Sequence, residues 1–181
     1  MEQGWAALLR AEQSRRLNVR AMGKADRGPG LRQGLEAGVP TFCEKPISLD
    51  LAEELTSSKD AMSWTVRLRP GLEFHNGKSV TAKDVLYSFK RIANPKAPHS
   101  GGPALAPLDL GGAKVLDSRT LRIPMKTPYA TFIDQICNNY YFAIVPAGYN
   151  PRKPVGTGPF MYRSFVPGKQ SVFDRNPNYH K

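Results

Sequence analysis

Alternation of apolar and polar residues is the clearest pattern in the second part of the chain, and it predicts β-strands. Trp64, Val66 and Leu68 alternate with polar neighbours, which is the period-two pattern of a strand with one buried face. Asn76-Gly77 supplies a tight turn shortly afterwards. By the same reasoning we expect a hairpin over 114–125, a buried strand over 141–145, and a pair of strands over 160–166 and 171–174.

Helical spacing appears most clearly over 81–93. Thr81 and Asp84 have the spacing of a capping box at a helix N-terminus. The apolar face of this helix would consist of Val85, Phe89 and Ile92. Shorter helices are expected over 48–55, which starts with acidic residues, and over 128–136. Residues 95–112 contain four prolines and four glycines, so they predict a long surface loop.

Strands outnumber helices in this pattern, which predicts a mixed α+β fold. The polar stretch 56–61 separates two kinds of sequence, because the helix, strand and turn pattern before it gives way to alternation after it. We therefore expect two parts. Residues 1–58 would form an N-terminal appendage with a short α/β fragment, and residues 59–181 would form the main domain.

The net charge of +11 raises the question of a nucleic-acid partner. Residues 1–58 carry 8 basic and 8 acidic residues, so the whole excess lies in residues 59–181. These cations are scattered singly, without a basic helix or an RNA-binding aromatic motif beside them. The charge is therefore interpreted as a solvated basic face, and no nucleic acid is expected as a partner.

The residue types that bind metals or form disulfides are few and widely spaced. Cys43 and Cys137 show neither CxxC nor Cys/His spacing, so neither a disulfide framework nor a zinc site is expected. His75, His99 and His180 lack carboxylate or cysteine companions at ligand spacing. They are interpreted as turn or surface histidines, and no metal site is predicted.

Several longer strings carry a family resemblance. Residues 64–78 and 80–91 resemble the family 5 extracellular solute-binding proteins, which are the peptide and nickel binders of ABC importers. Three later strings match the same family in the same order: 117–123, 154–160 and 175–179. Each string is weak alone, but the collinear matches cover about 115 residues from residue 63 onward. The resemblance implies part of one lobe of a two-lobed periplasmic-binding-protein-like fold of type II.

The same resemblance implies a function. The protein would be the substrate-binding component of an ABC transporter, located in the periplasm or otherwise outside the cytoplasm. It would deliver oligopeptides or a related solute to permease subunits in the membrane, without being an enzyme and without a cofactor. Peptides in such clefts are held mainly through their backbones.

The ligand-binding candidates are Asn138, Asn139, Tyr140 and Tyr141, which precede a predicted strand. Paired amides and tyrosines at this position would line a cleft between two lobes. The alternative is that the tyrosines pack against the edge of the core, as tyrosines between a helix and a strand often do. Both interpretations stay open at this stage.

Family members are several times longer than the matched stretch, are exported and have a second lobe. This chain shows no signal-peptide pattern. We therefore expect the 181-residue chain to be truncated and to bind no peptide by itself, because part of one lobe supplies only one wall of a cleft.

The front of the chain resembles a different family. Residues 35–54 are similar to the Glu-Lys-Pro segment of the glucose-fructose oxidoreductase and inositol dehydrogenase family, in which the lysine matching Lys45 lies beside the nicotinamide. The alternative function is thus a remnant of an NAD(P)-dependent oxidoreductase. However, Gly28-Pro29-Gly30 lacks the dinucleotide-binding spacing and a preceding strand. Two such resemblances in one chain are expected from a natural fusion, a truncation or a misassembled reading frame.

Overall fold

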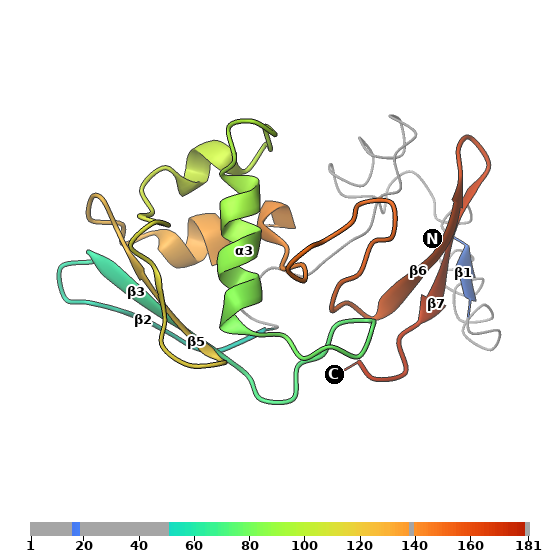
Figure 1. Cartoon of the computed structure of the whole chain (residues 1–181), viewed down its shortest axis with the longest axis horizontal. Helices are drawn as coiled ribbons and strands as arrows, with labels where there is room; N and C mark the ends of the chain where they lie inside the picture. Colours follow the sequence, from blue (N-terminus) through green and yellow to red (C-terminus); the bar gives the residue numbers. More distant parts are fainter. Residues whose placement is uncertain (1–15, 19–50, 138–139, 180–181) are drawn as a thin grey trace, which may run out of the picture.

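The computed structural model describes residues 16–18, 51–137 and 140–179. Two antiparallel sheets stand at opposite ends of the molecule, and loops connect them (Figure 1). The larger sheet has the strand order β2-β3-β5-β4, and the smaller one has the order β1-β7-β6. Helix α3 covers one face of the larger sheet. The mixed α+β content expected from the sequence is therefore present.

The four-stranded sheet follows the alternation of the sequence. Its strands are β2 (Ala52–Ser57), β3 (Ser63–Leu68), β4 (Lys114–Val115) and β5 (Thr120–Pro124). Trp64 lies opposite Ile123 and Val66 opposite Leu121, and all four side chains are buried. The hairpin predicted over 114–125 is confirmed, with β4 paired to β5. One sheet face therefore supplies apolar side chains to the core.

The helix predicted over 48–55 is wrong for its described residues, because Ala52–Ser57 form strand β2. Leu55 pairs with Val66 on β3, and a bulge falls between Ala52 and Glu54. Helix propensity is a weak preference that strand pairing readily overrides. The predicted domain boundary between residues 58 and 59 falls in the turn joining β2 to β3, so β2 belongs to the same sheet as β3.

Helix α3 (Ala82–Ile92) begins as its sequence predicts. The backbone N–H of Thr81 donates to Asp84 Oδ2 at 2.9 Å, and the Thr81 hydroxyl donates to the same oxygen at 2.6 Å. The predicted apolar face is buried in full: Val85, Phe89 and Ile92. Lys90 and Arg91 occupy the last turn, where cations favour the negative end of the helix dipole.

The segments after α3 are less regular than the sequence suggests. They contain the 3₁₀ helices η4 (Gly102–Leu105) and η6 (Tyr140–Phe142) and the π-helical turn η5 (Ile133–Cys137). The loop predicted over 95–112 also contributes Leu105 and Leu108 to the core. The strand predicted over 141–145 is absent from the structure, although Phe142, Ile144 and Val145 are buried as expected.

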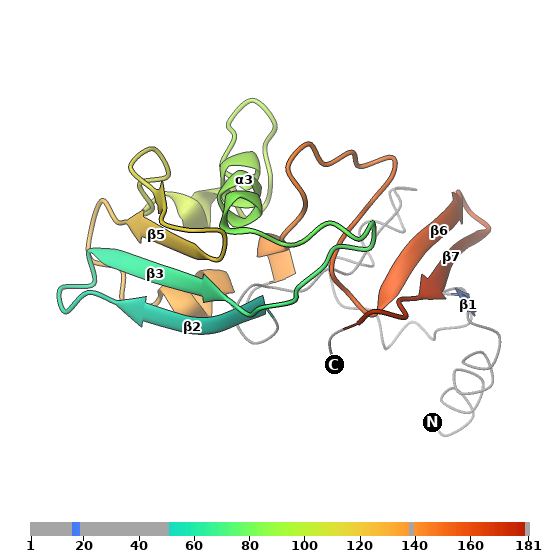
Figure 2. The same ribbon diagram turned by 60° about the horizontal axis from the view of Figure 1, so that its bottom comes forward.

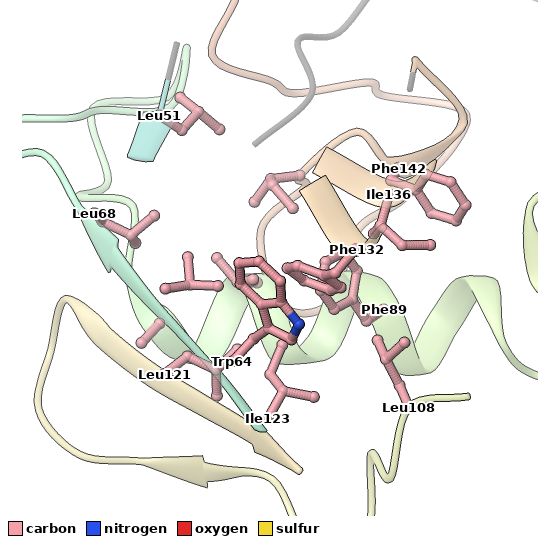
Figure 3. Packing of buried hydrophobic residues seen from close by; sticks show 14 of the residues in the cluster. Leu51, Trp64, Leu68, Phe89, Leu108, Leu121, Ile123, Phe132, Ile136 and Phe142 are labelled. Carbon is pink, nitrogen blue, oxygen red and sulfur yellow. The ribbon is translucent and has the colours of Figure 1, made fainter. Parts of the chain in front are cut away.

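The core lies between the four-stranded sheet, α3 and the η5–η6 region (Figure 3). At its centre the rings of Trp64 and Phe132 stack with their centroids 5.2 Å apart. The Trp64 indole N–H donates to the Tyr129 carbonyl at 2.9 Å, so the polar atom of this buried ring is satisfied. A sheet residue and an η5-region residue far apart in sequence thus meet in one apolar cluster.

The smaller sheet contains the predicted strand pair. Strands β6 (Phe160–Val166) and β7 (Gln170–Arg175) form an antiparallel hairpin, and β1 (Arg16–Asn18) pairs with β7. Tyr162 and Phe173 face each other across the hairpin, with an edge-to-face contact at 6.4 Å. The prediction of strands over 160–166 and 171–174 is confirmed.

Candidate functional site

The stretch after η6 is held in place by polar side chains of α3. Ser88 Oγ accepts a hydrogen bond from the Val145 N–H at 2.9 Å, and it lies 3.1 Å from the Val145 carbonyl. Asp84 Oδ1 accepts from the Ala147 N–H at 2.9 Å. The two side chains thus take the place of a neighbouring strand for residues 145–147. This explains how the end of an apolar run expected to be a strand is buried without belonging to a sheet.

Of the four candidate ligand-binding residues, the structure describes Tyr140 and Tyr141, which precede this stretch. Asn138 and Asn139 fall outside the described residues, as does Lys45. Tyr140 is the first residue of η6. Tyr141 is half-buried and packs against the core beside Phe142. Core-edge packing, one of the two alternatives raised by the sequence, therefore describes Tyr141, and its role toward a ligand stays a prediction.

A second junction joins the two ends of the molecule. His75 lies in the turn before α3 and forms hydrogen bonds with the loop that precedes β6. The His75 backbone N–H donates to the Gly156 carbonyl at 2.8 Å. The Gly156 N–H approaches His75 Nδ1 at 3.2 Å, and His75 Nε2 lies 2.9 Å from the Gly158 carbonyl oxygen. One histidine therefore contacts the loop through its backbone and both ring nitrogens.

The environment of His75 differs from that of a surface histidine. It lies in a turn as expected, but burial lowers the pKa of its ring, and the hydrogen bond to Gly158 opposes this effect. Burial and the Arg91 guanidinium likewise lower the pKa of His99. No group of three metal-ligating side chains occurs among the residues described by the structure. These histidines are part of the loop architecture.

Several of the charged residues that are scattered along the sequence lie on the outer face of the larger sheet. Lys114 and Arg122 lie directly opposite each other on β4 and β5. They border a surface hollow of about 300 Å³ that Asp60 also lines. Farther along the same face, Glu53 forms exposed ion pairs with Arg67 and Arg119, each at 3.5 Å, and such pairs add little stability. The cations are therefore spread over a sheet face rather than gathered on one element.

Sequence reasoning identified the capping role of Asp84 but missed what Asp84 and Ser88 do for residues 145–147. A signal was present, because two polar residues four positions apart lie on the apolar side of α3. Buried polar groups need partners, so their presence predicts a polar contact with another segment. The identity of that segment is decided by the fold.

Comparison with solved structures defines the class of protein. The fold matches periplasmic binding proteins that contain both sheets and helices. A solved structure of the binding protein AgaA in complex with agropinic acid, from A. tumefaciens R10, is 28% identical to the chain with a TM-score of 0.70. The match covers 82% of this chain and 32% of AgaA. A periplasmic murein tripeptide-binding protein, MppA, in its unliganded open form has the same fold, with a TM-score of 0.62 at 24% identity over 72% of this chain and 29% of MppA.

The family follows from the sequence match. The family described as bacterial extracellular solute-binding proteins, family 5 Middle, matches residues 46–181, and the chain belongs to this family. The probable D,D-dipeptide-binding periplasmic protein DdpA of Escherichia coli K12 is 32% identical over 142 residues, covering 72% of this chain and 27% of DdpA. Di/tripeptide-binding protein 4 of Pseudomonas aeruginosa UCBPP-PA14 is 28% identical over 156 residues, covering 72% of this chain and 29% of that protein.

These matches confirm the resemblance stated for residues 63 onward and extend it to residue 46. The chain spans between about a quarter and a third of the length of these relatives. The relatives are solute-binding proteins rather than enzymes, and the findings give no support to the oxidoreductase alternative. In the described residues, no helix has both the length and the apolar character required to cross a bilayer.

Proposed function

We propose that this chain provides part of the substrate-binding component of an ABC importer. The component captures an oligopeptide or a related small solute outside the cytoplasm and delivers it to permease subunits in the membrane. The observation that carries this proposal is the family match over residues 46–181. Relatives named for D,D-dipeptide and di/tripeptide binding support peptides as the first candidate solutes.

In this proposal the chain forms part of one lobe of a two-lobed type II fold. The four-stranded sheet with α3 gives the lobe a rigid apolar core, and the β6–β7 hairpin extends it at the other end. A lobe of this kind supplies one wall of a ligand cleft, and the second wall comes from another part of the protein. Two-sided enclosure is needed because a peptide recognised through its backbone requires hydrogen bonds around its whole length.

Within that wall, the residues proposed to approach the ligand remain Asn138, Asn139, Tyr140 and Tyr141. The support for this placement is the rigid anchoring directly after them. Phe142 is fully buried, and Val145 and Ala147 are bonded to side chains of α3. A binding segment fixed on one side by a packed helix loses little conformational entropy when a ligand arrives.

A chimaera tests the function. Residues 46–181 of this chain replace the matching stretch of the E. coli D,D-dipeptide-binding relative, and the melting temperature is measured with and without a D,D-dipeptide. Because a ligand that binds only the folded state stabilises it, we expect the melting temperature to rise with dipeptide concentration. An L,L-dipeptide and the unmodified relative serve as controls.

Two outcomes would contradict the proposal. A chimaera that has the circular dichroism of the relative but shows no shift with any peptide would mean that this segment does not support solute binding. Quenching of tryptophan fluorescence by NADH in the native chain would instead favour an oxidoreductase. In a folded chimaera, Tyr141→Phe separates ligand contact from packing, because it removes the hydroxyl and keeps the ring.

A further inference from the structure

The hydrogen bonds around His75 fix the protonation state of its ring. The Gly156 backbone N–H can only donate, so His75 Nδ1, at 3.2 Å, must accept. The Gly158 carbonyl oxygen can only accept, so His75 Nε2, at 2.9 Å, must carry the proton. The arrangement is therefore complete only for a neutral imidazole with its proton on Nε2.

We propose that His75 is a pH-sensitive latch between the two ends of the molecule. While the ring is neutral, it fastens the loop 156–158, and with it the β6–β7 hairpin, to the turn that leads into α3. Protonation adds a second N–H at Nδ1, which then points at the Gly156 N–H. Two donors face each other, and this side of the latch opens.

The loop keeps its bonds to the hairpin when the latch opens. Asn176, which follows β7, donates from its side-chain amide to the Gly158 carbonyl at 3.1 Å. Its backbone N–H donates to the Pro159 carbonyl at 2.8 Å. These contacts do not involve the histidine ring, so the loop stays with the hairpin. At the turn before α3, protonation removes only the contact at Nδ1, while the His75 backbone N–H still donates to Gly156 and Nε2 still donates to Gly158. The views of Figures 1 and 2 place this loop between the two sheets.

The chemistry around the ring favours the neutral state. Burial lowers the pKa of His75 from its ordinary value of 6.5, and the bond from Nε2 to Gly158 opposes the shift only in part. Four charged residues lie near His75 and its loop in the sequence. They are Glu73 and Lys78 in the turn, Lys153 before the loop and Arg175 after it. The latch is thus closed at neutral pH and opens as the pH falls.

The first test is an NMR titration of the full chain. The ring nitrogen shifts of His75 should report the proton on Nε2 at pH 8 and a pKa below 6.5. A proton on Nδ1 at pH 8, or a pKa at or above 6.5, would overturn the proposal. This measurement needs no variant.

The second test follows amide hydrogen exchange, expressed as protection factors so that the intrinsic pH dependence cancels. The Gly156 amide should lose protection between pH 8 and pH 5, by roughly tenfold for each pH unit below the pKa of the ring. The Asn176 amide, bonded to Pro159, should keep its protection. Equal behaviour of the two amides would refute the latch.

A matched pair of variants isolates the histidine. His75→Gln keeps a donor for Gly158 but does not titrate, so it should abolish the pH dependence of Gly156 protection. His99→Gln removes the other histidine whose pKa is lowered and should leave that dependence unchanged. If His99→Gln abolishes the dependence, or if a folded His75→Gln retains it, His75 is not the latch. If His75→Gln does not fold, the titration and exchange of the wild-type chain decide the question.

Discussion

Two buried serines in this protein have opposite surroundings, and replacing each by alanine gives a direct test of the polar contacts on α3. Ser88 has no exposed surface and Ser171 only 3%. The Ser88 hydroxyl serves the Val145 N–H, the Val145 carbonyl and the Asp84 carbonyl, at 2.9, 3.1 and 2.8 Å. In the described part of the chain, the Ser171 hydroxyl has no hydrogen-bond partner.

The magnitude follows from the groups left behind. Ser88→Ala strands the buried Val145 N–H, which costs about 1–3 kcal/mol. It also removes the single hydroxyl proton that lies within hydrogen-bond distance of the Asp84 and Val145 carbonyls, which adds about 1 kcal/mol. We therefore expect a total loss of about 2–4 kcal/mol in the free energy of unfolding. Ser171→Ala removes a hydroxyl that has no partner, so its effect should lie between zero and a gain of about 1 kcal/mol.

Urea denaturation followed by circular dichroism measures both changes. The urea midpoint of Ser88→Ala should fall with an unchanged m-value, since the surface exposed on unfolding is the same. A loss below about 1 kcal/mol for Ser88→Ala would show that water replaces the serine at Val145. If both variants lose the same free energy of unfolding, the hydrogen bonds of Ser88 to Val145 contribute no more to stability than the Ser171 hydroxyl does.

Three further outcomes are expected. Phe132→Ala should cost about 3–5 kcal/mol, since it leaves a cavity beside Trp64, and Phe132→Leu should cost less. Gly101→Ala should destabilise by about 1–3 kcal/mol, because its Cβ would lie 2.9 Å from the Phe142 ring. As the pH falls below 6.5, the melting temperature should decrease. The pKa values of His75 and His99 are lower in the folded chain than in the unfolded chain, so the unfolded chain binds protons at a higher pH and is favoured.

Each of these has its own check. The Phe132 and Gly101 variants are compared by urea denaturation, and Gly111→Ala, whose Cβ would meet only the Asp109 side chain at 3.4 Å, serves as the glycine control. If Gly101→Ala leaves the urea midpoint unchanged, the Phe142 ring moves to make room for the added Cβ. For the histidines, stability is complete above 6.5 and declines as the pH falls through their lowered pKa values. A melting temperature that stays level down to pH 5 would contradict this.

The sequence predicted the elements whose signals are local. Strand β3 and the β6–β7 hairpin follow from alternation, and α3 follows from its apolar face and capping box. These patterns depend on neighbours a few residues away, and the structure reproduces them. Strand β2 was mistaken for a helix because its acidic residues favour helices locally, whereas pairing with β3 fixes the outcome.

The contacts that organise the candidate site were beyond such reasoning. Ser88 and Val145 are 57 positions apart, and His75 and Gly156 are 81 apart. The residues around each position give no indication of these distant partners. The proposed ligand residues Asn138 to Tyr141 came from their types and position within a resemblance, and they stay a prediction. The family itself was predictable, because four collinear matches carry turn and capping chemistry that single positions would not identify.

The register of the larger sheet has a consequence for the order in which the chain folds. Ser63 of β3 pairs with Pro124 of β5, whereas the partner of β3 on its other side, β2, is its neighbour in sequence. During synthesis the β2–β3 hairpin and α3 can form early from local contacts. The centre of the sheet must wait until β5 has been made, because closing so long a loop is slow. The apolar face of β3 is exposed in the meantime, so this hairpin is where a nascent chain is most prone to aggregate.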